Sequence, residues 1–145
     1  MEGYTTKEMQ RVNYLQSEMN AAYHEAAVKL GMSDSTVQIL YAVCNSGDSC
    51  LLSDICKMMG TSKQTINSAL RKLEGEGLVY LEFSGGRKKR VRLTDRGREL
   101  AEGTVVRLIE AENSILEDWS REEVEQFLRL SRKYLEALRE KIREL

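Results

Sequence analysis

The segment from Leu51 to Thr94 constrains the fold most. It begins with LLSDICKMMG, which ends at Gly60, continues as a helical pattern to Gly77, and finishes as two alternating stretches, LVYLEF and KRVRLT. The residues between these two stretches include Ser-Gly-Gly, which predicts a turn. Glycine ends helices readily because it adopts left-handed conformations at little cost, and a period of two is typical of strands. The segment therefore predicts a short helix, a second helix and a two-stranded hairpin.

The second of these helices separates apolar from polar residues. Thr61 and Gln64 have the spacing of a capping box, which predicts that the helix begins at Thr61. An inward stripe is predicted from apolar residues at three- and four-residue intervals, and the intervening residues are polar. The inward residues are Ile66, Ala69, Leu70 and Leu73, and the outward residues are Lys63, Gln64, Asn67, Ser68 and Arg71.

The hairpin has two candidate registers. A two-residue turn at Gly85-Gly86 would place Leu81 opposite Arg90. A three-residue turn instead places Leu81 opposite Val91 and Glu82 opposite Arg90, so apolar residues face each other and opposite charges are paired. We therefore expect the three-residue turn.

Long amphipathic stretches flank the central segment. Apolar residues recur at helical spacing from Met9 to about Gly31, and Ser33 can cap a further helix that is closed by NSGDS. After the hairpin we expect one helix from Thr94 to about Trp119. Because the sequence contains no proline, no proline interrupts these helices.

The last helix is expected to begin at Ser120, which has capping-box spacing with Glu123. A single chain offers few partners for the apolar stripes of the terminal helices, so we expect them to pack against a second copy. In the last helix the stripe advances alternately by four and three residues, as in a coiled-coil seam. It comprises Val124, Leu128, Ser131, Leu135, Leu138, Ile142 and Leu145.

These elements predict a mainly α fold with a small antiparallel β-hairpin wing. The expected arrangement is a winged helix-turn-helix at residues 32–97. It is flanked by an N-terminal dimerisation helix at residues 1–31 and by C-terminal dimerisation helices at residues 98–145.

Positive charge is concentrated in the same region. Residues 62–98 contain ten Lys or Arg and four acidic residues, a net charge of +6, whereas the other residues sum to −7 and the chain to −1. A local basic surface on such a chain favours a local nucleic-acid contact. A polar helix can read bases in the major groove, and a basic hairpin can contact phosphates or the minor groove. The expected DNA-binding residues are Ser62, Lys63, Gln64, Thr65, Asn67, Ser68, Arg71, Arg87, Lys88, Lys89 and Arg90.

With these features the sequence resembles the MarR family of bacterial transcriptional regulators. The resemblance rests on MSDSTVQIL, on LLSDICKMMGTSKQTINSALRKLEGEGLV and on Arg87–Gly97, which contains LT-x-x-G. It implies a homodimer on palindromic promoter DNA, with a recognition helix in the major groove and a wing-tip arginine in the minor groove. The chain departs from the family at Gly85-Gly86-Arg87, where Asp-x-Arg is common.

A regulator of this kind would respond to whatever changes the angle between its helical base and its winged lobes. We therefore also expect modulation by a small-molecule effector at that junction. The N-terminal residues lack a signal-peptide pattern, and no apolar run approaches the ~18 residues of a membrane span. We expect a cytoplasmic protein with no membrane partner.

The three cysteines and the single histidine give little support for a disulfide framework, a metal site or a catalytic site. Cys44, Cys50 and Cys56 form an odd number at six-residue spacing, which is typical of reduced thiols. Cys44 and Cys56 lie on apolar stripes, whereas Cys50 falls in an expected loop and is the candidate redox thiol. With only His24 as a nitrogen ligand, we expect no metal site, no cofactor and no catalytic residues.

Alternative functions stay open. The chain could be a thiol-based redox-sensing regulator, or a winged-helix protein-interaction module that does not bind DNA. An interaction module would expose aromatic or aliphatic anchors on the second helix, whereas this face is Lys, Gln, Asn, Ser and Arg. The wing charges could also be a solvated edge that prevents strand pairing. An enzyme is the weakest alternative.

Overall fold

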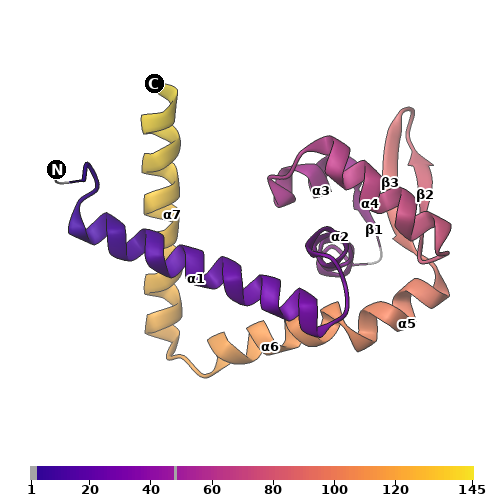
Figure 1. Ribbon diagram of the computed structural model, residues 1–145, viewed down its shortest axis with the longest axis horizontal. Coiled ribbons are helices and arrows are strands. Elements are labelled where there is room, and N and C mark those ends of the chain that lie inside the picture. Colours follow the sequence, from indigo (N-terminus) through magenta and orange to yellow (C-terminus); the bar gives the residue numbers. More distant parts are fainter. Residues whose placement is uncertain (1–2, 48) are drawn as a thin grey trace. The chain divides into compact units, whose positions relative to one another are not determined.

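The computed structural model describes residues 3–47 and 49–145. The first two residues of the expected N-terminal segment and Asp48 of the expected NSGDS loop therefore lie outside the described residues. Within those ranges the chain forms seven helices and three strands (Figure 1). They are α1 (Lys7–Lys29), α2 (Asp34–Asn45), β1 (Ser49–Leu51), α3 (Leu52–Met59), α4 (Lys63–Gly75), β2 (Val79–Ser84), β3 (Lys88–Leu93), α5 (Asp95–Gly103), α6 (Val105–Glu117) and α7 (Arg121–Arg143).

The chain divides into two compact units, Met1–Leu108 and Ile109–Leu145. The first unit contains α1 to α5, the three strands and the beginning of α6. The second contains the rest of α6 and all of α7. The division into residues 1–31, 32–97 and 98–145 made above groups the chain by role and stays a prediction.

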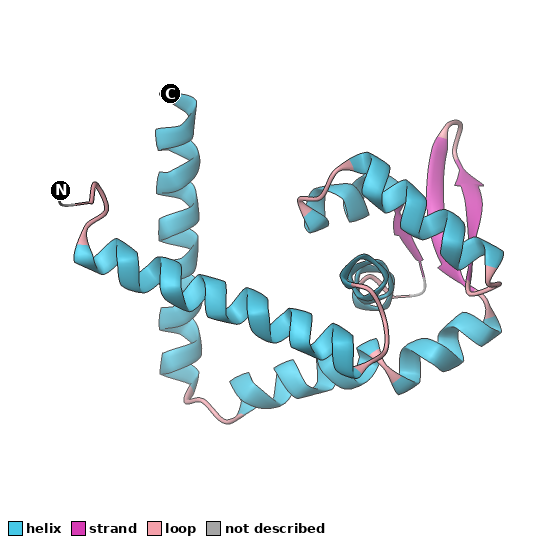
Figure 2. Cartoon of the chain, viewed as in Figure 1, coloured by secondary structure: helices cyan, strands magenta, loops and turns pink. Residues whose placement is uncertain are grey.

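The three strands form one antiparallel sheet in the order β1-β3-β2, with β2 and β3 as a hairpin (Figure 2). Leu81 lies opposite Val91 and Glu82 opposite Arg90, which confirms the expected register and the three-residue turn Gly85–Arg87. Both glycines of the turn have positive φ angles, 58° and 81°. Glycine adopts this conformation without the steric cost that a Cβ atom brings.

Strand β1 was not expected from the sequence. Cys50 pairs with Val91 of β3, and its side chain is only 3% exposed. The placement of Cys50 in a loop is therefore wrong. Three residues are too few to show alternation, and β1 exists because it pairs with β3 about forty residues later in the chain, a contact that a local pattern does not encode.

The core of the first unit lies between the sheet and the helices α2, α3 and α4, with contributions from α5 and α6. The inward stripe of α4 is confirmed, and Cys44 and Cys56 are partly buried against the same core, as expected. The largest fully buried side chains come from α2, α3, α4, β3 and α6. They are Ile39, Leu40, Ile55, Ile66, Leu73, Val43, Val91 and Val105.

The N-cap of helix α4 lies one residue later than expected. Ser62 is its N-cap, because the Ser62 hydroxyl accepts a hydrogen bond from the Thr65 N–H at 3.2 Å. The Thr61 hydroxyl instead donates to the carbonyl of Met59 at 3.2 Å and closes the turn at Gly60. The expected Thr61–Gln64 capping box is therefore wrong, and Gln64 is exposed on the helix surface.

The expected continuous helix from Thr94 to Trp119 is wrong, because it breaks at Thr104 into α5 and α6. Thr104 leaves the helical conformation, with φ −130° and ψ −90°. Its hydroxyl donates to the Leu100 carbonyl at 2.7 Å, and its N–H bonds to Ala101. The side chain thus takes the carbonyl that its own N–H would use in an uninterrupted helix, a known way to bend helices.

In the second unit, α7 begins with the expected capping box. The Ser120 hydroxyl accepts from the Glu123 N–H at 3.1 Å, and the Ser120 N–H donates to the Glu123 carboxylate at 2.9 Å. The backbone hydrogen bond from Ser120 lowers the pKa of the Glu123 carboxyl group. Four apolar residues of the α7 seam are 41–56% exposed: Leu128, Leu135, Leu138 and Ile142.

A close backbone contact joins the end of α4 to the start of α5. The Thr94 N–H donates to the carbonyl of Leu78 at 3.1 Å, and the Thr94 hydroxyl donates to the carbonyl of Gly77 at 2.6 Å. The same hydroxyl caps α5 by accepting from the Gly97 N–H at 3.0 Å. A Cβ atom at residue 97 would lie 1.8 Å from the Leu78 carbonyl oxygen, so only glycine fits there.

We expect Gly97→Ala to lower the free energy of unfolding by about 3 kcal/mol or more, because the added methyl group must displace backbone. Gly75→Ala is the matched control. Gly75 lies in the last turn of α4, and an added Cβ meets no atom within 4 Å. The control is expected to be neutral or to stabilise by up to about 1 kcal/mol. Urea unfolding followed by circular dichroism measures both, and equal midpoints for Gly97→Ala and the wild type would contradict the contact.

Candidate DNA-binding surface

The outward face of α4 is polar along its length. Lys63, Gln64, Ser68 and Arg71 are exposed, and Asn67 is half-buried. The face therefore presents amide, hydroxyl, ammonium and guanidinium groups, which can donate or accept hydrogen bonds at base edges and phosphates. The structure brings these expected residues together on one side of one helix.

Ser62 and Thr65 have a local role in addition to their place on this face. Their hydroxyl oxygens lie 2.8 Å apart, and Ser62 caps the helix. Both side chains are exposed. They therefore fix the start of α4 and with it the position of Lys63 and Gln64, which are the first two residues of the helix.

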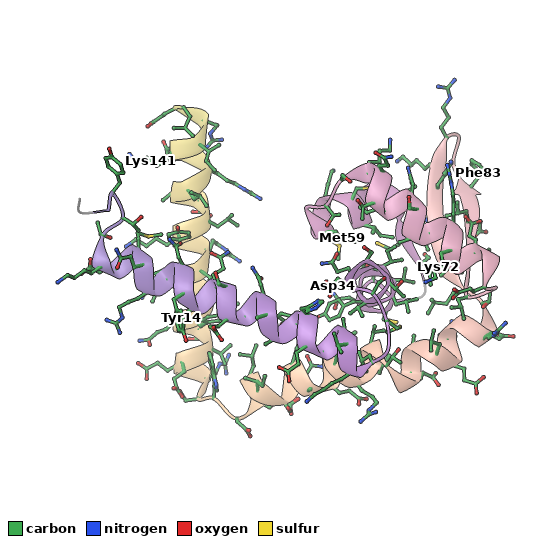
Figure 3. The ribbon with its side chains drawn as sticks, viewed as in Figure 1. Tyr14, Asp34, Met59, Lys72, Phe83 and Lys141 are labelled. Atoms are coloured by element: carbon green, nitrogen blue, oxygen red, sulfur yellow. The ribbon has the colours of Figure 1, made fainter. Side chains whose placement is uncertain are left out.

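A groove beside α4 adds residues that the sequence analysis did not single out. It is lined by Ser33, Ser35 and Thr36 at the start of α2 and, on α4, by Gln64, Thr65, Ser68, Ala69 and Lys72. Figure 3 labels Lys72 on α4 and Asp34 on α2. The sequence placed Ser33 at a helix cap and Lys72 next to Arg71. It contained no signal that the two helices, thirty residues apart, line one groove.

The wing, defined as β2, β3 and the turn between them, carries its cations in two groups. Arg87, Lys88 and Lys89 are exposed near the turn. Arg90 is half-buried, and its guanidinium donates to the Ser49 hydroxyl of β1 at 3.2 Å. Arg90 is thus the one expected DNA-binding residue of the wing whose guanidinium already has a partner within the sheet.

The acidic residue of the wing pairs with a different arginine from the one it faces. Glu82 lies opposite Arg90 in the register, but its carboxylate forms an ion pair with Arg92, the diagonal neighbour on the same face. Diagonal neighbours lie within reach of long side chains. At the base of the wing, Arg92 is therefore paired with Glu82, and Arg90 is bonded to Ser49. The cations near the turn are exposed to solvent.

Residues that could support other chemistry lie apart. The described part of the chain contains no group of three or more His, Cys, Asp or Glu residues that could hold a metal ion. His24 Nδ1 lies 2.9 Å from the carboxylate of Asp34, so the imidazole joins α1 to α2. The buried Cys50 thiol accepts a hydrogen bond from the Ser46 hydroxyl at 3.5 Å. Among residues 3–47 and 49–145, no helix is long and apolar enough to cross a membrane.

Comparisons with known proteins identify the fold. Residues 30–90 match the model of the MarR family. No curated protein matches the chain. Both the family resemblance and the fold class expected from the sequence are confirmed by this match together with the solved structures.

Three similar structures illustrate the match. A MarR family regulator from Neisseria meningitidis is 16% identical, with a TM-score of 0.83, and the alignment covers 96% of this chain and 99% of that one. The MepR–DNA complex of S. aureus is 25% identical, with a TM-score of 0.64 and coverage of 94% and 99%. NadR in complex with 4-hydroxyphenylacetate is 16% identical, with a TM-score of 0.70 and coverage of 92% and 96%.

The burial of Cys50 leads to a prediction about thiol reactivity. In a Cys44→Ser, Cys56→Ser variant, the remaining Cys50 is expected to react with a thiol reagent only at the rate at which the fold opens, because its side chain is 3% exposed. The matched control retains only Cys56, which is partly exposed and is expected to react faster. If Cys50 in the native protein reacted as fast as Cys50 in the denatured chain, the interpretation of the protein as a thiol-based redox sensor would be supported.

Proposed function

We propose that the chain is a MarR family transcriptional regulator that binds double-stranded DNA as a homodimer. The observation that carries the proposal is the polar, exposed face of α4 together with the exposed cations of the wing, both in one compact unit. The match of residues 30–90 to a family of regulators supports a regulatory rather than an enzymatic role. We place its action in the cytoplasm, without a membrane partner or a cofactor.

In this proposal α4 is the recognition helix and lies in the major groove. Gln64, Asn67 and Arg71 are the residue types that form hydrogen bonds with adenine and guanine edges. Lys63, Ser68 and the cap residues Ser62 and Thr65 bind the flanking phosphates, and Lys72 in the adjoining groove extends this contact. The DNA-bound state of MepR, at 25% identity, supports DNA as the ligand.

In this proposal the wing contributes more to the affinity for DNA than to the recognition of its base sequence. Arg87 at the turn enters the minor groove, where a narrow groove concentrates negative potential. Lys88 and Lys89 bind phosphates, and each contact releases counterions. Arg90 contributes less than these three, because its guanidinium already donates to Ser49.

The apolar surfaces of the terminal helices support a homodimer. Val12, Leu15 and Met19 of α1 are 42–59% exposed, and four apolar residues of the α7 seam are 41–56% exposed. Contiguous exposed apolar surface of this kind marks an interface. Two copies related by a two-fold axis would present two recognition helices to half-sites about 34 Å apart on a palindrome.

An effector can act on such a dimer by changing the spacing of the two recognition helices. The complex of NadR with 4-hydroxyphenylacetate supports a small molecule as the effector of this chain. A ligand that prefers the dimer whose helix spacing does not match the two half-sites lowers the affinity for DNA. Bound DNA lowers the affinity for that ligand by the same factor.

The test is a binding titration on the DNA immediately upstream of its own gene, followed by footprinting. Protection of an inverted repeat is expected. Variants then separate the two parts of the surface. Asn67→Ala or Arg71→Ala is expected to cost about 1–3 kcal/mol on the protected site and little on scrambled DNA, because these residues read base edges.

Arg87→Ala is expected to weaken binding to both DNAs and to reduce the log–log salt slope by about one unit, because it removes a charge contact. Arg129→Ala on α7 is the charge-matched control and is expected to bind as the wild type does. Arg129 is exposed and lies on the side of α7 away from the seam. Wild-type protein that binds no duplex, or wing variants that bind both DNAs normally, would contradict the proposal.

A substitution in the α7 seam tests whether the protein is a homodimer. Leu135→Glu is expected to convert a dimer into a monomer at micromolar concentration, because it places a charge in the apolar stripe. Arg129→Glu introduces the same side chain on the other side of α7 and is expected to remain dimeric. Light scattering measures the mass of each variant. A monomeric wild type, or a Leu135→Glu variant that dimerises equally well, would contradict the homodimer.

A further inference from the structure

Phe83 is an exposed aromatic residue on a wing that is otherwise polar near its turn. It follows Val79 and Leu81 on the face of β2 that is directed toward the core. Along this face the exposure rises from 3% at Val79 to 68% at Phe83, as the hairpin extends past the core. Figure 3 shows Phe83 on the wing. Burying such a side chain would stabilise the fold, and the fold leaves most of this ring exposed.

Lys89 accompanies the ring. It lies directly opposite Phe83 in the register, and its Nζ atom is 5.9 Å from the ring centroid. A cation over the face of an aromatic ring is attracted by the ring quadrupole. The pair therefore presents an apolar surface and a positive charge side by side.

The chemistry beside this pair selects one class of partner. Lys89 is the cation that lies over the ring, and the turn beyond it carries the exposed Arg87. Lys88 is exposed as well, but it pairs with Ser84 and therefore belongs to the other face of the hairpin. A protein-docking surface needs a cluster of apolar anchors. Tyr80, the other exposed aromatic residue of β2, lies opposite Arg92 on the other face of the hairpin. A single ring beside one ammonium group, on a hairpin with a basic tip, fits the alternating sugars and phosphates of a nucleic-acid backbone.

The position of Phe83 and Lys89 along the hairpin would place them at the edge of the DNA minor groove. Phe83 and Lys89 form the second pair of the ladder, counted from the turn, and Ser84 and Lys88 form the first. Two residue steps of about 3.3 Å each place Phe83 and Lys89 about 7 Å from the turn. When Arg87 enters the minor groove, the pair reaches the sugar-phosphate wall of that groove. The two glycines that precede Arg87 offer no side chain to fix the orientation of the tip.

We infer that Phe83 and Lys89 form a second contact of the wing with DNA. The Phe83 ring packs against a deoxyribose at the edge of the minor groove, and the Lys89 ammonium group binds the adjoining phosphate. This inference rests on the proposed DNA binding and extends it. The pair orients the wing in a chain whose turn has Gly85 where an aspartate is common.

The two residues are expected to differ in their salt dependence. Packing on a sugar releases no counterion, so Phe83 contributes equally at all salt concentrations. The phosphate contact of Lys89 releases counterions, so its contribution falls as salt rises. The wing then combines a salt-independent and a salt-dependent part, which affinity measurements at several salt concentrations can separate.

The experiment measures affinity for the footprinted duplex over a range of salt concentrations with the full chain. Phe83→Ala is expected to weaken binding about tenfold at every salt concentration with an unchanged slope, because it removes apolar contact area. Lys89→Met is expected to reduce the slope by about one unit. Tyr80→Ala, from the opposite face of the same strand, is the matched control and is expected to bind as the wild type does.

Hydroxyl-radical footprinting provides a second readout, because the radical attacks deoxyribose directly. Sugars at the wing position are expected to be protected by the wild type and by Tyr80→Ala, and exposed with Phe83→Ala at saturating protein. This readout separates a DNA contact from a change in stability, because a merely destabilised variant protects the same sugars once it is bound.

The outcomes distinguish this inference from the proposed function. If the wild type binds DNA and Phe83→Ala matches it in affinity and in sugar protection, the inference is overturned and the proposed function stands. If the wild type binds no duplex, both are overturned. An equal loss for Tyr80→Ala and Phe83→Ala would also overturn the inference, because the effect would not belong to the Phe83 face.

Discussion

The surface described above depends on the close approach of two backbone segments at Leu78. The Leu78 carbonyl accepts the Thr94 N–H at 3.1 Å and occupies the space that a Cβ atom at residue 97 would need. Because Thr94 also donates to Gly77, the start of α5 is joined to the turn between α4 and β2. Helix α4 ends just before this turn and the wing begins just after it, so the orientation of one relative to the other is fixed there.

The charged residues of the wing differ between its base and its turn. Near its base, Arg92 pairs with Glu82 and Arg90 donates to Ser49, and both bonds connect neighbouring strands of the sheet. Near the turn, Arg87, Lys88 and Lys89 are exposed. A hairpin that is anchored by an ion pair and a hydrogen bond at one end can present charge at the other without loss of register, since the register is also fixed by the apolar pair of Leu81 and Val91.

Features with a local cause could be predicted from the sequence. The hairpin register follows from facing Leu81 and Val91, and the caps at Ser33 and Ser120 follow from short-range hydrogen bonds. The cap of α4 was misplaced because Thr61 and Ser62 are adjacent and both are good capping residues. Only the hydrogen bond of Thr61 to the preceding turn decides between them.

Features with a non-local cause could not be predicted. Burial of Cys50 depends on a strand pairing with Val91, and the groove beside α4 depends on the position of Ser35 on another helix. The break at Thr104 is local, but a threonine in a helix either bonds to solvent or bends the chain, and the pattern does not say which. Lys89 shows how the two kinds of cause combine. Its charge and its position opposite Phe83 can be read from the sequence and the register, whereas the exposure of that ring follows from how far the hairpin extends beyond the core.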